Sequence, residues 1–334
     1  MKPLLSFLHY QWFIIALILC VSIGWWQSSW FEPIAENKTL RSVLVASVMF
    51  FMALPIPLGQ IKKSLFSPFP VLLAVFLNIG IMPMAAALIA SQLDESFAGG
   101  LIVAACVPCT LASAAVWTRR GGGDETVPIL VTLITNGTCF ITAPLWLQLL
   151  LGTTTKLPLT EMVFDLLVTV LVPIVAAQVL NSRKSIHAWA SRKKHSLSLF
   201  CQIGILAMVL IGGTQIGLRW NHAGSIAGLT GMIVQIFLLA VAFHLAMVWL
   251  GWTLAKLFSF DREKTVAVSI AGSQKTLMVG LQLSIDCGVS ILPMVAYHVM
   301  QLIADSYLVQ WWITNQNPTK QLLPTVDGKD NVDN

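Results

Sequence analysis

A series of ten long apolar segments restricts the fold of this chain more than any other feature. A helix that crosses the hydrocarbon core of a bilayer needs about 20 apolar residues, and each segment approaches that length. The segments are 12–30, 42–58, 69–91, 98–118, 127–151, 161–180, 197–218, 225–256, 264–284 and 291–313. Only 10% of the residues are charged, against about 25% in an ordinary soluble domain. The sequence therefore excludes a soluble enzyme and predicts an all-α polytopic membrane protein with ten transmembrane helices.

Basic residues accumulate in the loops on one side of this predicted bundle. With the N-terminus in the cytoplasm, 15 of the 20 Lys and Arg residues fall in cytoplasmic loops, as the positive-inside rule requires. The outer loops hold Lys38, Arg41, Lys156 and Arg219, and Lys275 lies within a span. We therefore expect both termini in the cytoplasm and the chain in the plasma (cell inner) membrane. Membrane insertion accounts for the net charge of +5, which requires no nucleic-acid partner.

Two of the apolar segments are interrupted. Pro108 lies in the middle of the fourth segment, and five small or polar residues, 272–276, interrupt the ninth. Broken helices at corresponding positions are typical of transporters built from inverted repeats. We predict a transmembrane domain over 1–317, with one five-helix repeat at about 1–155 and a second at about 156–317, followed by a polar cytoplasmic tail at 318–334. The alternative is that proline and glycine merely kink these helices for packing.

Lys275 is the most unusual single residue, because a lysine at the centre of a span costs about 2.5–3.5 kcal/mol on insertion scales. One hypothesis is a structural clamp with Asp305 or Asp286, the nearest acidic candidates in sequence. Another is a contact with an anionic substrate or a proton relay formed with His298 and Asp305. We expect His298 and His244 to be buried neutral histidines bonded to carbonyl groups.

Two further observations concern metal binding and catalysis. Cys109 follows the proline of the fourth span, where a broken helix would place its thiol beside a polar cavity as a soft ligand for a metalloid. No phosphate-binding loop, catalytic triad or zinc-binding motif occurs in the sequence. We therefore expect neither an enzyme nor a protein with a bound cofactor or metal.

Several short runs of the sequence form a recognisable set: Asn78–Pro83, Pro108–Ser113, Thr132 with Pro144, Gly272–Gln274, and Tyr297, His298, Gln301 and Ser306. Together they resemble the bile acid:sodium symporter family, and the resemblance covers nearly the whole chain. The tenth-span residues and Lys275 look most like the divergent, solute-carrier-like branch of that superfamily. The resemblance implies a panel domain and a core domain in which the broken fourth and ninth helices cross. It also implies a secondary active transporter that moves a small organic anion or a sterol-like amphipathic solute by alternating access in the lipid bilayer.

The resemblance extends to individual sites. Ser113 and Thr132 match a first sodium site of the family, and Asn78 and Gln274 match ligands of a second. Lys275 stands beside both as a further candidate for substrate or ion binding.

The chain differs from the family at the position that supplies the negative charge of a sodium site. Ile270 stands where the family has a carboxylate, and Ala114 and Pro128 replace two further polar ligands. We therefore expect Lys275 to replace the sodium charge and transport to be coupled to protons or to no ion. Sodium remains the alternative to the proton as a possible coupling ion. The remaining alternatives are metalloid (arsenite-type) efflux through Cys109 and a non-transporting membrane regulator.

Overall fold

The computed structural model describes residues 12–56, 68–93, 95–111, 113–152, 157–220 and 229–314, and every regular element among them is a helix. The elements up to residue 151 are α2 (Trp12–Trp26), α3 (Ser28–Glu36), α4 (Lys38–Ala53), α6 (Pro68–Val75), η2 (Phe76–Ile81), α7 (Met82–Ala90), α8 (Glu95–Cys106), α9 (Ser113–Arg120) and α10 (Thr126–Leu151). The elements that follow are α11 (Leu159–Leu166), η3 (Leu167–Leu171), α12 (Val172–Asn181), α13 (Lys184–Arg192), α14 (Lys194–Trp220), α15 (Leu229–Leu257), α16 (Arg262–Ser273), α17 (Leu277–Asp286) and α18 (Leu292–Thr314). The predicted tail at 318–334 lies outside the described residues.

Five of the described helical stretches are long and apolar enough to cross a membrane. They are Pro68–Ala90, Thr126–Leu151, Leu159–Asn181, Lys194–Leu218 and Gly231–Leu257. The helices α2 and α3 form a sixth candidate as a pair bent by 100°. The first predicted span, 12–30, is therefore not one straight helix, because α2 ends at Trp26 and the chain turns at Gln27.

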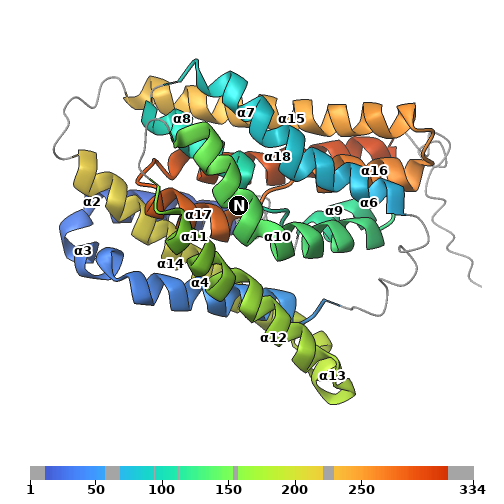
Figure 1. Ribbon diagram of the computed structural model, residues 1–334, viewed down its shortest axis with the longest axis horizontal. Coiled ribbons are helices and arrows are strands. Elements are labelled where there is room, and N and C mark those ends of the chain that lie inside the picture. The colour runs from blue at the N-terminus through green and yellow to red at the C-terminus, as the bar shows by residue number, and fades with distance from the viewer. Residues whose placement is uncertain are drawn as a thin grey trace, which may run out of the picture.

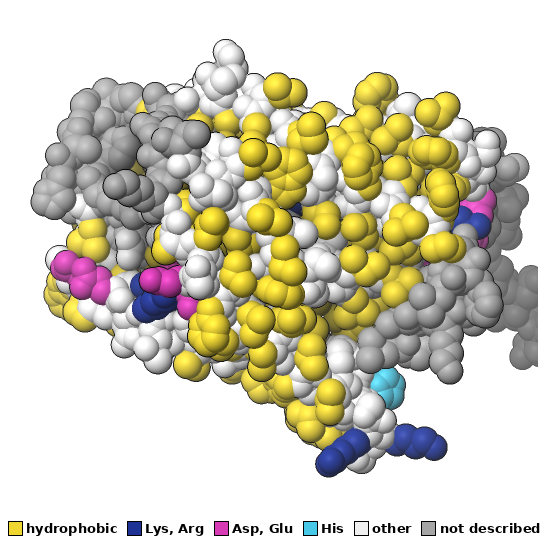
Figure 2. Space-filling view, in the orientation of Figure 1, with side chains coloured by type: hydrophobic (Ala, Val, Ile, Leu, Met, Phe, Trp, Pro, Cys, Tyr) yellow, Lys and Arg dark blue, Asp and Glu magenta, His cyan; other side chains and the backbone are white. Residues whose placement is uncertain are grey.

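The outside of the bundle is apolar. Large side chains such as Leu88, Leu149 and Trp249 are each more than half exposed. Hydrophobic side chains cover the middle of the face in Figure 2, and charged side chains gather toward its edges. A soluble protein does not expose apolar surface on this scale, so the chain is a multi-pass membrane protein.

The helices pack in two groups, which occupy the lower and upper halves of Figure 1. In the lower group, α14 packs against α2, α3 and α4, and α12 packs against α4. In the upper group, α15 packs against α16 and α18, and α10 packs against α6 and α16. The helix α17 contacts α4 and α14, which brings the two groups together beside the break between α16 and α17.

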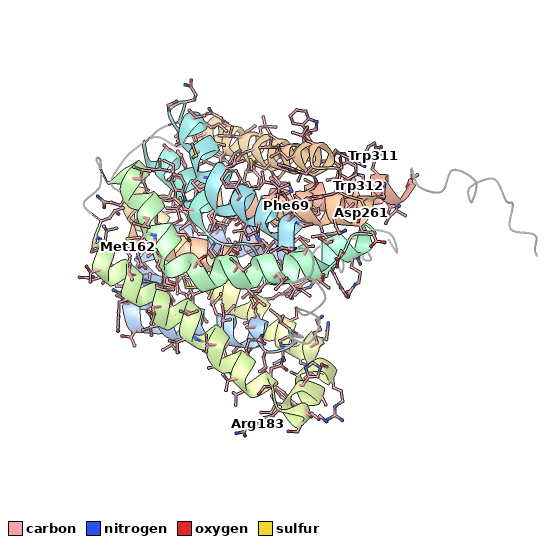
Figure 3. The ribbon with its side chains drawn as sticks, turned by 45° about the vertical axis from the view of Figure 1, so that its right-hand side comes forward. Phe69, Met162, Arg183, Asp261, Trp311 and Trp312 are labelled. Atoms are coloured by element: carbon pink, nitrogen blue, oxygen red, sulfur yellow. The ribbon has the colours of Figure 1, made fainter. Side chains whose placement is uncertain are left out.

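Both predicted interruptions are present. The backbone leaves helical geometry after α8 and resumes it at α9, and it is extended at Gln274 and Thr276, with ψ angles of 142° and 128°. Asp261, whose side chain accepts from the backbone N–H of Lys264, begins α16 at one end of the bundle. Figure 3 shows Asp261 and Trp312 at that end and Met162 at the opposite end. Each broken segment thus runs from one end of the bundle toward the other through an unwound centre.

Candidate functional site

Side chains of α10 hold the unwound segment between α8 and α9. Proline has no N–H, so Pro108 cannot continue the helix, and the backbone groups around it need other partners. The backbone N–H of Cys109 donates to Thr135 Oγ1 at 3.1 Å, and Asn136 Nδ2 donates to Cys109 O at 2.8 Å. The Thr132 hydroxyl donates to Thr110 O at 3.0 Å. Thr132 therefore stabilises the broken helix and lies beside it.

Three side chains from other helices satisfy the carbonyl groups of the α16–α17 break. Asn78 Nδ2, from η2, donates to Ala271 O at 3.0 Å and to Gln274 O at 2.9 Å. Gln301, from α18, accepts from the Lys275 N–H and donates to Lys275 O, both at 3.0 Å, as a neighbouring β-strand would. The Tyr297 hydroxyl donates to Ser273 O at 2.7 Å. These bonds keep the unwound backbone inside the bundle, where exposed polar groups would each cost several kcal/mol.

The two breaks cross in direct contact. The Thr276 N–H donates to Pro108 O at 3.0 Å, and Lys275 Nζ donates to Val107 O at 2.8 Å. Segments more than 160 residues apart in sequence thus bond through backbone groups that a continuous helix would keep to itself. The crossing that the family resemblance implied is the centre of the site.

Lys275 is fully buried, and oxygen atoms surround its ammonium group. Besides Val107 O, Nζ donates to Asn78 O at 2.6 Å and lies 3.3 Å from Asn78 Oδ1. The carbonyl of Asn78 is free because the N–H of Met82 donates to Leu77 O and Pro83 has no N–H to donate. Three oxygen acceptors match the three N–H donors of an ammonium group.

The clamp hypothesis for Lys275 is wrong. Among the described residues, no carboxylate forms an ion pair with Lys275: Asp286 lies 3.5 Å from Arg41, and Asp305 pairs with His244. The sequence concealed the real partners because they are mostly backbone carbonyls. Pro83, five residues after Asn78, was the signal that one of them is free.

Asp305 supplies a buried carboxylate from α18. His244 Nε2 lies 2.9 Å from Asp305 Oδ1, and Gln274 Nε2 donates to Asp305 Oδ2. The Ser113 hydroxyl donates to Gln274 Oε1 at 2.7 Å. The expectation that His244 bonds a carbonyl is therefore wrong, because its partners are Asp305 and, at 3.2 Å, the Tyr297 hydroxyl.

A cavity of about 400 Å³ lies between the two groups of helices, beside the crossing. Its polar wall comes from the two breaks, α10 and α18, through Thr110, Ser113, Thr132, Thr276 and His298. Its apolar wall comes largely from the lower group, through Phe13, Phe51, Met52, Leu197, Cys201 and Ile205. Arg119, Glu125 and Lys194 line the end of the cavity that reaches exposed side chains.

The residues singled out from sequence fall into two layers around this cavity. Ser113, Thr132 and His298 line it. Asn78, Gln274 and Lys275 lie directly behind the polar wall and are joined to it through the hydrogen bond between Ser113 and Gln274.

The other candidates lie apart from the cavity. Cys109 is buried and is not among the residues that line it. In the part of the chain that the structure covers, no group of three or more His, Cys, Asp or Glu side chains is placed to hold a metal ion.

The predicted relay of Lys275, His298 and Asp305 is not a connected chain. Lys275 Nζ bonds Asn78 and Val107, and His298 Nδ1 bonds Gln301 Nε2 at 2.9 Å. The partner that sequence reasoning missed for Asp305 is His244, whose only signal was an ionisable residue inside an apolar span.

These features define a helical membrane protein with two broken, crossing helices beside a central cavity. Residues 11–313 match the model of the SBF-like CPA transporter family, and the chain belongs to that family. The chain is 25% identical to sodium/bile acid cotransporter 7-B of Xenopus laevis, over 95% of this chain and 97% of that protein. It is 22% identical to sodium/bile acid cotransporter 7 of Rattus norvegicus, over 97% and 99% of the two chains. It is also 26% identical to the probable sodium/metabolite cotransporter BASS4, chloroplastic, of Arabidopsis thaliana, over 68% of this chain and 55% of that one.

Proposed function

We propose that this protein is a secondary active transporter that moves an organic anion or a sterol-like amphipathic solute by alternating access. The observation that carries the proposal is the cavity between the two helix groups, one wall of which is made by the crossing breaks. Broken helices at a repeat interface are where many secondary transporters bind their solutes. The lower group is the panel domain, the upper group is the core domain, and together they form ten spans in two inverted repeats.

The cavity opens toward one end of the bundle. Its exposed lining residues Arg119 and Lys194 lie at the ends of α9 and α14 that the positive-inside rule assigns to the cytoplasm. At the other end, Arg41 of α4 lies 3.5 Å from Asp286 of α17, which joins the lower group to the upper one. We therefore propose that this is an inward-open state. In this proposal both termini are in the cytoplasm and the protein is in the plasma (cell inner) membrane.

The lining favours a solute with a large apolar body and an anionic group. Aromatic and aliphatic side chains such as Phe51 and Ile205 provide the apolar surface. At the mouth, Arg119 is paired with Glu125 at 3.0 Å, and the nearby Lys194 adds a second basic group. A solute with its anionic head near Lys194 and its apolar body against the lower group would match both the basic mouth and the apolar wall of the cavity.

Lys275 makes sodium a poor coupling ion for this site. Its ammonium already occupies the oxygens of Asn78 and Val107 that would otherwise hold a cation. A sodium ion about 4 Å from that ammonium would be repelled by about 4 kcal/mol at an effective dielectric constant of about 20. We therefore propose coupling to protons or to no ion, with Ser113, Thr132, Asn78, Gln274 and Lys275 as the binding residues.

The proposal is tested by blocking the cavity. The purified protein is first screened by thermal shift against sterol-like anions, including taurocholate and estrone sulfate, and the stabilising compounds are assayed for uptake into proteoliposomes. Ser198→Trp places a large ring in the cavity and should abolish uptake, whereas Leu199→Trp, on the neighbouring exposed position outside the cavity, should not. Uptake that survives Ser198→Trp, or no stabilising anion at all, would count against this function and favour a non-transporting regulator.

A further inference from the structure

The proposed function assigns a role to Lys275 but none to the buried pair of His244 and Asp305. Both side chains are fully buried, on α15 and α18 respectively, and His244 Nε2 lies 2.9 Å from Asp305 Oδ1. A histidine and a carboxylate in the centre of a membrane bundle are costly, and such pairs commonly mark proton pathways.

The hydrogen bonds fix where protons are in this pair. The Tyr297 hydroxyl donates its hydrogen to Ser273 O at 2.7 Å, because a carbonyl oxygen can only accept. The same hydroxyl oxygen lies 3.2 Å from His244 Nδ1 and must accept there, so Nδ1 carries a hydrogen. A neutral ring would then present a lone pair at Nε2 to Asp305 Oδ1. The short Nε2–Oδ1 contact therefore requires one further proton, held by either atom.

The second carboxylate oxygen is connected to the cavity. Gln274 Nε2 donates to Asp305 Oδ2, and Gln274 Oε1 accepts from the Ser113 hydroxyl, which lines the cavity. A solute that takes the Ser113 hydrogen for itself weakens the position of the Gln274 amide and, through it, the bond to Asp305. Binding in the cavity and the charge of the pair are then linked, and each changes the free energy of the other.

The positions and hydrogen bonds of the neighbouring titratable groups indicate that the further proton belongs to His244 and Asp305. Tyr297 has its hydrogen on Ser273 O, and Lys275 directs its ammonium to Asn78 and Val107. Cys109 lies buried in the α8–α9 break, and His298 faces the cavity and bonds Gln301.

We propose that His244 and Asp305 together form the proton-binding site of this transporter. The pair holds one exchangeable proton between Nε2 and Oδ1. Both side chains are fully buried in the state described here, and the proton exchanges with water in another state of the cycle, which the purified protein also visits at equilibrium. The inference rests on the proposed function for its role in transport, but the proton site itself can be observed without any solute.

The test is nuclear magnetic resonance of the purified full-length protein with carbon-13-labelled histidine, between about pH 5 and about pH 8, where a histidine ordinarily changes charge. The signal missing from His244→Gln identifies the residue. In the wild type this signal should change with pH, and in Asp305→Asn it should remain that of a neutral ring throughout the range. Asp165→Asn, which removes a carboxylate bonded to Lys38 at the far end, should behave as the wild type does.

Ser113→Ala tests the link to the cavity. Loss of its hydrogen bond to Gln274 should displace the pH midpoint of the His244 signal without abolishing the change. A His244 signal that is constant across the range, or one that Asp305→Asn leaves unaltered, would overturn the assignment. Because no solute or gradient is used, such a failure is distinct from an absence of transport.

Discussion

Replacing Lys275 tests whether its ammonium acts as a tethered cation. Lys275→Met keeps most of the apolar stem and removes the charge, so Asn78 O and Val107 O, at 2.6 and 2.8 Å from Nζ, lose their donor. A buried acceptor left unsatisfied costs about 1–3 kcal/mol, so the pair costs about 2–6 kcal/mol before the gain from no longer burying a charge. We expect a clear fall in the thermal unfolding midpoint of the purified protein.

Lys275→Ala should differ from Lys275→Met in its response to sodium. The shorter side chain vacates the space among the oxygens of Asn78 and Val107, which then resembles a cation site. Sodium at about 100 times its dissociation constant would restore about 2.7 kcal/mol to the alanine variant. The methionine variant, whose side chain fills the space, should not respond.

The assay is thermal unfolding of the wild type and both variants in sodium chloride and in choline chloride at equal ionic strength. The reasoning is refuted if neither variant is less stable than the wild type. It is also refuted if sodium stabilises all three proteins equally, because the oxygens of Asn78 and Val107 would then play no part in binding sodium.

Two further predictions concern the ends of the bundle. Asp261→Ala should destabilise the start of α16 by about 0.5–2 kcal/mol, seen as faster amide exchange there, whereas Asp261→Asn should retain the cap. The side-chain bond to Lys264 lowers the pKa of Asp261, so its stabilising effect is present above the ordinary carboxyl pKa and is lost as the pH falls through the lowered value. Arg41→Gln removes the ion pair with Asp286 and should increase alkylation of an Ile285→Cys variant at the end of the bundle opposite the cavity mouth. Unchanged labelling would show that this ion pair does not close that end.

The sequence predicted the parts of this fold that depend on local composition. Long apolar runs form long helices because only helices and closed β-barrels satisfy their backbone inside lipid, and these runs are longer than a barrel strand. The breaks were found because Pro108 lacks an N–H and because the run from Gly272 to Thr276 is too polar for a lipid-facing helix. The turn after Trp26 was not found, because the short polar run of Gln27, Ser28 and Ser29 lies at the end of the predicted span rather than in its middle.

The site was less accessible to sequence reasoning because its key contacts join distant residues. His244 and Asp305 are 61 residues apart, and nothing in either local sequence indicates the other. The loss of a carboxylate at Ile270 suggested a site without negative charge, whereas α18 brings Asp305 to the neighbouring Gln274. Backbone acceptors such as Val107 O carry no sequence signal except a nearby proline.

The most direct measurement of the central claim is uptake under separate ion gradients. Proteoliposomes containing the wild type are given the anion that most stabilises the protein in the thermal-shift screen, with an imposed sodium gradient or an imposed proton gradient. If the Lys275 ammonium occupies the oxygens of Asn78 and Val107 and the His244–Asp305 pair carries the proton, the proton gradient should drive accumulation and the sodium gradient should not. Accumulation driven by sodium alone in the wild type would contradict this account.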